Sequence, residues 1–186
     1  MAGLSHAVYS RERVVIQFQE EEVRECWDEL CPLAADHHAS SMNYKRHEPF
    51  NPKRERYEQY NDAGMFRLLT ARDQGQLVGY FGVYFMESMH SQLPIAREDT
   101  FYLAPSHRGG RNALRFLRAV EAFISQIGGP HIEILFSCES DNTSGIHKLL
   151  RMLDYIPVIT VYSKSISTRA DSAEPSVMEA AHVGTQ

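Results

Sequence analysis

One stretch, residues 100–127, constrains the fold more than any other part of the chain. It begins with a short run typical of a β-strand, passes through a turn that contains Gly109 and Gly110, and then becomes strongly amphipathic. A turn between a strand and a helix can bind an anion, because the first N–H groups of a helix lack intrahelical partners and carry partial positive charge. Glycine has no Cβ, so a pyrophosphate can approach its backbone closely. The stretch therefore predicts a phosphate-binding turn.

The helix after this turn is indicated by apolar residues that recur at three- and four-residue steps. Gly128, Gly129 and Pro130 end it, because glycine accepts a left-handed cap and proline cannot continue the hydrogen-bond ladder. A second strand-like run follows at residues 131–136. Two strands that flank a helix of this length predict a βαβ crossover in a sheet. The apolar positions of the helix are Ala113, Phe116, Leu117, Val120, Phe123, Ile124 and Ile127.

The segment 103–113, LAPSHRGGRNA, is similar to the acyl-CoA pyrophosphate loop of the GNAT superfamily of N-acetyltransferases. That loop has the pattern Arg or Gln, two residues, Gly, one residue, Gly or Ala. Arg108 and Ala113 match its ends, whereas Arg111 occupies the position of the middle glycine. The strand before the loop and the helix after it give the short motif its weight. The alternative interpretation is a tight turn whose glycines serve backbone geometry alone.

The resemblance implies an α/β (α+β) fold with a mixed, mostly antiparallel central sheet flanked by helices, in which the βαβ unit binds the cofactor. It also implies transfer of an acetyl group from acetyl-CoA to an amine by direct attack, with CoA as the product. The backbone of the strand would pair with pantetheine and polarise the thioester carbonyl, and the turn would hold the pyrophosphate. The implied cofactor-binding residues are Phe101, Tyr102, Leu103, Arg108, Gly109, Gly110, Arg111, Asn112, Ala113 and Asn142.

The rest of the chain supplies the other elements of such a fold. The hairpin is the clearest of them, because two runs rich in β-forming residues flank a short turn that contains glycine. The GNAT family commonly has two helices between its first two strands, and two segments fit them. The expected elements are a strand at 14–18, a helix from about residue 20 that bends or ends near Pro32, a short helix from Pro52, hairpin strands at 65–72 and 77–86, a connection at 87–98, a helix at 146–153 and a strand at 156–166.

Two neighbouring carboxylates are candidates for the general base. Attack on a thioester needs a neutral amine, so a carboxylate, or a water held by one, accepts the proton. Glu98 and Asp99 precede the strand at the place where many GNAT enzymes carry an acidic residue. Alternation along a strand puts the two on opposite faces, so at most one easily enters the cleft, and we favour Glu98 slightly. The alternative is a pair of exposed charges at a strand entrance.

The general acid of the family has no direct counterpart. The tyrosine that protonates the departing thiolate is replaced, because the matching positions hold Leu149 and Leu150. Tyr155 and Cys138 are candidate substitutes, although both residue types commonly serve in packing. This absence, together with Arg111, favours a second hypothesis: an acyl-CoA-binding or protein-interaction module with a GNAT-like fold and little or no turnover.

The acceptor side is harder to assign. In GNAT-like folds the region between the first two helices overlies the acceptor, so Tyr44, His47, Glu48 and Tyr57 are candidates for substrate contact by position. Tyr80, on the hairpin, is a further candidate and is interpreted as core or cleft wall. The alternative for the loop is a solvated polar surface. The acceptor itself, a small-molecule or peptide amine, is left open because acceptor pockets are built from loops.

Charge and composition exclude several classes of partner. The formal net charge of −5, without a long Lys/Arg block, argues against nucleic-acid binding. No apolar run is long enough to span a membrane, and the first residues lack the pattern of a secretory signal, so we expect a soluble, cytoplasmic protein with no membrane partner. The three cysteines suggest neither a disulfide framework nor a zinc site, and we expect no metal.

The length of 186 residues fits one domain with short extensions. We expect an N-terminal extension over residues 1–13, a GNAT-like acetyltransferase domain over residues 14–166 and a flexible C-terminal tail over residues 167–186. The tail is predicted because Ser, Thr, Ala, Glu and Gly replace large apolar residues there. The oligomeric state is open, and a homodimer is one of the options.

Overall fold

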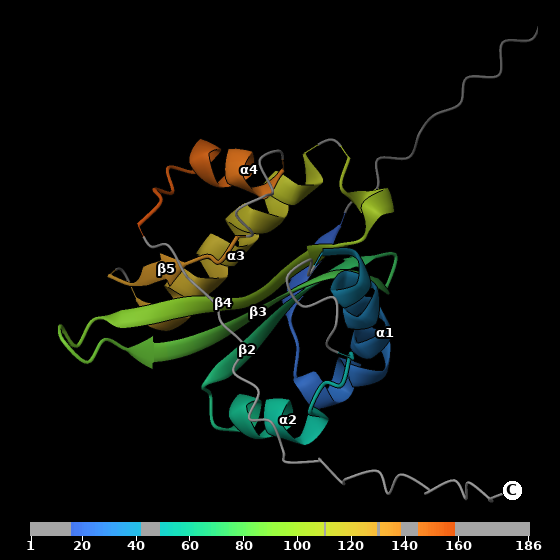
Figure 1. Cartoon of the computed structure of the whole chain (residues 1–186), viewed down its shortest axis with the longest axis horizontal. Helices are drawn as coiled ribbons and strands as arrows, with labels where there is room; N and C mark the ends of the chain where they lie inside the picture. The colour runs from blue at the N-terminus through green and yellow to red at the C-terminus, as the bar shows by residue number, and fades with distance from the viewer. Residues whose placement is uncertain (1–15, 42–48, 110, 130, 139–144, 159–186) are drawn as a thin grey trace, which may run out of the picture.

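The computed structural model describes residues 16–41, 49–109, 111–129, 131–138 and 145–158. Their strands form one five-stranded sheet in the order β1-β2-β3-β4-β5 (Figure 1). The first four strands are antiparallel neighbours, and β5 runs parallel to β4. This is the mixed, mostly antiparallel sheet expected from the sequence. The strands are β1 (Gln17–Glu20), β2 (Phe66–Asp73), β3 (Gln76–Glu87), β4 (Pro94–Leu103) and β5 (Glu133–Leu135).

Helices cover both faces of the sheet, as Figure 1 shows. Helices α1 (Val23–Ser41) and α2 (Arg54–Asp62) connect β1 to β2 and lie on one face. Helix α3 (Asn112–Gly128) connects β4 to the parallel β5 and lies on the other face, and α4 (Ile146–Met152) is on the α3 side. The predicted βαβ unit is therefore confirmed as β4-α3-β5.

The largest differences from the expected boundaries are at the start of β4 and in the middle of α1. The segment expected as a connection at 87–98 contains the first half of β4, which pairs with β3 from Pro94 onward. Charged residues hide this strand in the sequence, although Ala96 between them is completely buried. Helix α1 also continues through Pro32, whose ring lies on the exposed side of the helix. A proline there costs one helical hydrogen bond without a clash against the core.

Parts of the expected domain organisation lie outside the described residues. These are the N-terminal extension, the C-terminal tail and most of the strand expected at 156–166. Residues 156–158 are described and have no strand structure. Among the described residues, none of the helices combines the length and apolar character that crossing a membrane requires.

The sheet separates two hydrophobic cores because side chains alternate along β3 and β4. Phe81 and Val83 of β3 are completely buried on the α3 side, against Phe116 and Val120 of the helix. Tyr80 of β3 is buried on the opposite side, in the core formed with α1 and α2. The amphipathic pattern of α3 thus corresponds to real burial. Its five buried residues are Phe116, Leu117, Val120, Phe123 and Ile124.

A buried amide connects the two helices of the α1/α2 face to the sheet. Asn61 in the last turn of α2 is only 6% exposed. Its Oδ1 accepts a hydrogen bond of 2.9 Å from the backbone N–H of Val23, at the start of α1. Its Nδ2 donates a hydrogen bond of 3.2 Å to the carbonyl of Phe66, at the start of β2. One side chain therefore satisfies backbone groups of two other elements.

Replacing this amide should destabilise the fold. The substitution Asn61→Ala leaves a buried N–H and a buried carbonyl unpaired, which should lower the free energy of unfolding by about 2–4 kcal/mol. Chemical denaturation of the two proteins measures this difference. The control Gln59→Ala, at an exposed position of the same helix, should change it by less than about 0.5 kcal/mol. Equal effects of the two substitutions would contradict the bridging role of Asn61.

Candidate active site

A β-bulge in β4 is the centre of the candidate site. Gly82 of β3 pairs with Thr100 and Val83 pairs with Glu98, so Asp99 is the extra residue of β4. A bulge redirects side chains and bends the strand that carries it. Directly before the bulge, β4 pairs with β5, but only over Ile95–Arg97, and no described residue of β5 continues that pairing. The two parallel strands therefore part where the bulge begins.

Asp99 lies in a cavity of about 290 Å³ on the α1/α2 side of the sheet. The phenolic O–H of Tyr57, on α2, donates a hydrogen bond of 3.2 Å to Asp99 Oδ2. The neighbouring Thr100 lines the same cavity, as expected when a bulge turns two successive side chains to one face. Burial, followed by the negative charge of Asp99, raises the pKa of Tyr57 and keeps its hydroxyl protonated. Aromatic side chains from four elements form the walls: Trp27 of α1, Tyr57 of α2, Phe66 of β2 and Tyr80 of β3.

His37 forms the end of this cavity that is nearest to the predicted phosphate turn. Its Nδ1 lies 2.9 Å from the hydroxyl of Tyr80, and its ring stacks on Tyr102 with the centroids 4.7 Å apart. Burial, followed by the charge of Arg108, lowers the pKa of His37 to about 4. The imidazole is therefore neutral at neutral pH and brings no positive charge to the cavity.

Glu98 lies opposite Val83, on the α3 side of the sheet, and does not line the cavity that holds Asp99. Its Oε2 accepts a hydrogen bond of 3.1 Å from the backbone N–H of Ser137, which follows β5. Burial raises the pKa of Glu98 to about 7; the Ser137 N–H opposes this rise, and the charge of Asp99 adds to it. The two acidic residues thus face opposite sides, and the carboxyl group of Glu98 spans the gap between the parting strands.

The two candidate general acids also lie away from the cavity. The hydroxyl of Tyr155 is hydrogen-bonded to Glu121 of α3, and its ring packs edge-on against Phe136 at 5.5 Å. Burial, followed by the charge of Glu121, raises the pKa of Tyr155. Burial, followed by the charge of Glu98, raises the pKa of Cys138 to about 11, so this thiol is protonated at neutral pH.

The predicted phosphate turn leads from β4 into α3. Arg108 is held by a 2.6 Å hydrogen bond from its Nε to the carbonyl of Leu103, and its guanidinium lies 5.2 Å from the centre of the Tyr102 ring. Asn112 Nδ2 donates a 3.1 Å hydrogen bond to the carbonyl of His107. These side-chain bonds hold both ends of the turn, in addition to backbone hydrogen bonds from the N–H of His107 to the carbonyl of Ala104 and from the N–H of Arg108 to the carbonyl of Pro105. The preceding residues form a short 3₁₀ helix, Pro105–His107.

The described surface of this turn is open at Gly109. A Cβ added to Gly109 would meet no atom within 4 Å, and the φ angle of this residue does not require glycine. The glycine therefore keeps the approach to the backbone open without being needed for the fold. Arg111 at the N-cap of α3 makes no capping hydrogen bond through its side chain, so the first N–H groups of the helix are free of a side-chain cap. An anion can use these donors.

Several predicted site residues lie outside the described residues. Tyr44, His47 and Glu48 precede the described segment that begins at residue 49, and Gly110 and Asn142 are likewise not described. Their roles remain predictions. Among the described residues, no three His, Cys, Asp or Glu side chains are grouped as metal ligands.

Two residues of α1 that line the cavity, Trp27 and His37, are not among the site residues expected from the sequence. His37 in fact continues the three- and four-residue spacing of Trp27, Leu30 and Ala34 along α1, and all four line the cavity. The spacing was the available signal, and it was lost because Pro32 suggested an earlier end of the helix.

Known proteins resemble the chain in family and in fold. The family model described as "Acetyltransferase (GNAT) family" matches residues 22–153. None of the curated proteins compared with the chain matches it.

Solved structures similar to the chain share its fold at low sequence identity. A ribosomal-protein-alanine N-acetyltransferase from Brucella melitensis biovar Abortus 2308 is 19% identical with a TM-score of 0.60, over 81% of this chain and 99% of that chain. An aminoglycoside acetyltransferase from an uncultured soil metagenomic sample is 13% identical with a TM-score of 0.65, over 82% and 99%. AAC(6')-Iy, solved with the bisubstrate analogue CoA-S-monomethyl-acetylneamine, is 13% identical with a TM-score of 0.59, over 82% and 99%.

The raised pKa of Glu98 predicts how stability depends on pH. The carboxyl group is protonated in the folded state up to about pH 7, but ionises near pH 4.5 when unfolded, so the folded protein loses stability between these values as pH rises. The substitution Glu98→Gln removes this loss. It should raise the free energy of unfolding by roughly 2–3 kcal/mol at pH 8 and have little effect at pH 4.5. Urea denaturation at both pH values tests this; a pH-independent difference would contradict the buried, protonated state.

Proposed function

Because the chain belongs to the GNAT acetyltransferase family, we propose that it transfers the acetyl group of acetyl-CoA to the amine of an acceptor by direct attack on the thioester. The arrangement of β4 carries this proposal. Its bulge places Asp99 in a cavity large enough for a small molecule, and its C-terminal end leads into the open turn before α3. A single strand therefore connects an acceptor cavity to a phosphate-binding turn.

The residues present fit the cofactor, which supplies an activated acetyl group as a thioester. The backbone from Arg108 to Ala113 and the first N–H groups of α3 would hold the pyrophosphate. The backbone of Phe101, Tyr102 and Leu103 would pair with pantetheine, along the part of β4 that lies beyond its described pairing with β5. A backbone N–H of this segment would stabilise the negative charge that develops on the carbonyl oxygen.

Asp99 is the proposed acceptor of the proton that the amine loses. It lies in the cavity, where the Tyr57 hydroxyl holds its carboxylate, so an ammonium group can bind to it and be deprotonated. The neutral amine would then attack the carbonyl carbon and lose its second proton to water as the C–N bond forms and the C–S bond breaks. Water would return one proton to the departing sulfur, because thiols ionise near pH 8.5 and leave without strict need of a protein acid. Glu98 is the alternative base, since a pKa of about 7 suits that role.

A second function is favoured by two residues. Arg111 replaces the glycine of the family's loop, and Leu149 and Leu150 occupy the positions of the missing tyrosine. Both departures fit a module that binds acyl-CoA, or a protein partner, without turnover. Binding of acetyl-CoA without release of free thiol, across a broad panel of amines, would support this alternative.

The cofactor proposal predicts a graded effect at Gly109. Acetyl-CoA and CoA should raise the thermal unfolding midpoint of the protein, because both ligands bind only its folded state. Side chains of increasing size, in Gly109→Ala and Gly109→Val, should weaken binding progressively, by about tenfold or more for Val. Because a Cβ here meets no protein atom, the midpoint without ligand should change little. Unchanged affinity in both variants would contradict the loop assignment.

The assignment of the base predicts different effects of two isosteric substitutions. Asp99→Asn should lower kcat/KM for an accepted amine by about 100-fold or more, because the proton acceptor is lost. Glu98→Gln should lower it less, and both variants should keep their affinity for acetyl-CoA. Thiol release with each purified variant measures these effects. Loss of activity in Glu98→Gln, with activity kept in Asp99→Asn, would transfer the role to Glu98.

A further inference from the structure

The charge distribution around the acceptor cavity restricts the kind of amine that it can bind. Asp99 is the one carboxylate among the described residues that line this cavity. Burial, followed by the negative charge of Asp99, raises the pKa of Tyr57 on α2 and of Tyr80 and Tyr84 on β3. These three hydroxyls are protonated at neutral pH. The described part of the cavity therefore offers one negative charge, surrounded by neutral aromatic groups.

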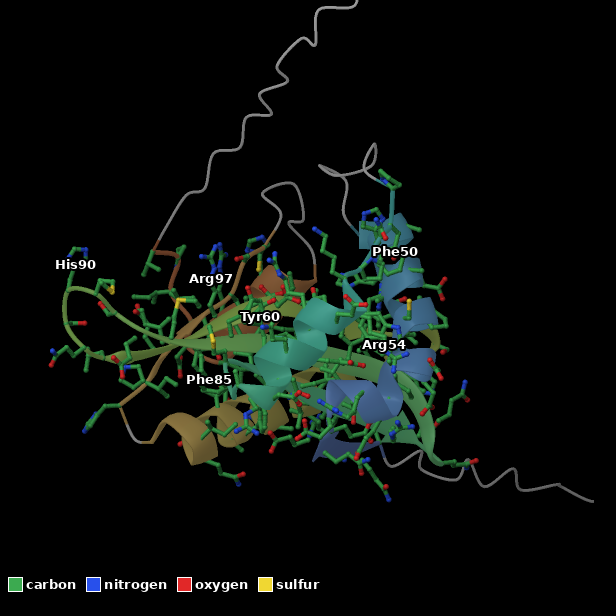
Figure 2. The ribbon with its side chains drawn as sticks, turned by 90° about the horizontal axis from the view of Figure 1, so that it is seen from below. Phe50, Arg54, Tyr60, Phe85, His90 and Arg97 are labelled. Carbon is green, nitrogen blue, oxygen red and sulfur yellow. The ribbon has the colours of Figure 1, made fainter. Side chains whose placement is uncertain are left out.

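The walls of the cavity are suited to an apolar body. Trp27 and Tyr57 lie with their ring centroids 6.3 Å apart, and Tyr57 contacts Phe66 edge-on at 5.2 Å. Phe50, from the segment before α2, contacts His38 of α1 at 5.6 Å, and both residues line the cavity. Figure 2 shows Phe50 beside the α1 ribbon, far from His90 at the tip of the β3-β4 hairpin. An aromatic or aliphatic group fits such walls, and aromatic faces also attract an ammonium group.

Positive charge lies next to this cavity. Tyr57, Asn51 and Pro52 also line an adjoining groove of about 310 Å³, and the other residues of this groove include Lys53 and Arg56. Burial, followed by the charge of Asp99, raises the pKa of Tyr84, and the charge of Arg56 opposes this rise. A ligand that extends from Asp99 past Tyr57 therefore meets two cations. A second or third ammonium group on that ligand would be repelled.

We propose that the acceptor is a small amine with a single positive charge on an aromatic or aliphatic body, and that polycationic amines such as aminoglycosides are excluded. This inference rests on the proposed function, because it assigns the cavity to the acceptor of the acetyl group. The ammonium group pairs with Asp99, the body packs between Trp27 and Tyr57, and Lys53 and Arg56 repel further positive charge.

The sole tryptophan of the chain makes the inference directly testable. Trp27 is the one tryptophan among the 186 residues and lines the cavity, so its fluorescence reports occupancy without any catalysis. The probe is 2-phenylethylamine, titrated into the full-length protein saturated with CoA. We expect a saturable change in fluorescence. Kanamycin, which carries several ammonium groups, should bind at least about tenfold more weakly.

A matched ligand and a matched variant isolate the role of the charge. The neutral isostere 2-phenylethanol should bind about tenfold more weakly than the amine, because it lacks the charge-assisted contact to Asp99. In Asp99→Asn the ratio of the affinity for the amine to the affinity for the alcohol should fall to about one. In the control Asp36→Asn, at an exposed position of α1 outside the cavity, it should remain about tenfold. Kanamycin binding as tightly as the amine, or an unchanged preference in Asp99→Asn, would overturn the inference.

The same samples separate this inference from the proposed function. If acetyl-CoA raises the thermal midpoint but 2-phenylethylamine leaves the Trp27 signal unchanged, the inference about the acceptor fails and the cofactor site stands. If the amine binds with the expected dependence on Asp99 but acetyl-CoA does not bind, the amine site is supported and the proposed transfer reaction fails.

Discussion

The parting of two parallel strands is the constraint on which the rest of the site depends. β4 pairs with β3 on both sides of the bulge, from Pro94 to Leu103. It pairs with β5 only over Ile95–Arg97. The bulge at Asp99 falls directly after this short pairing and bends β4 away. The carboxyl group of Glu98, bound to the Ser137 N–H, spans the gap that opens. Backbone groups of β4 beyond Arg97 therefore have no partner among the described residues of β5.

The bulge also explains why two adjacent carboxylates have different environments. Asp99 is turned toward α2, where its carboxylate accepts a hydrogen bond from the Tyr57 hydroxyl. Glu98 is turned toward the α3 side. Burial there raises the pKa of Glu98 to about 7, so ionisation of this group lowers the stability of the folded protein. A regular strand would also alternate the two side chains, but it would not turn Asp99 and Thr100 into the same cavity.

The sequence predicted the β4-α3-β5 unit well, because the amphipathic pattern of α3 and the glycines on both sides of it act locally. It predicted the start of β4 poorly, since Arg97 and Glu98 conceal a strand whose only completely buried side chain is Ala96. The cavity was not predictable in detail. Its walls come from α1, α2, β2, β3 and β4, and they meet only through long-range packing such as the bridge made by Asn61. The bulge itself has no local signature.

Figure 1 shows α1 on one face of the sheet and α3 beginning after the end of β4. The Asp99 cavity, which α1 lines, and the predicted phosphate turn before α3 therefore belong to different parts of the chain. The stack of His37 on Tyr102, with Arg108 near the same ring, connects them. A crystal structure with bound CoA tests this account most directly. It should place the pyrophosphate on the first N–H groups of α3 and the thiol beside the bulge, within reach of the Asp99 cavity. CoA bound elsewhere, or a thiol directed away from Asp99, would contradict it.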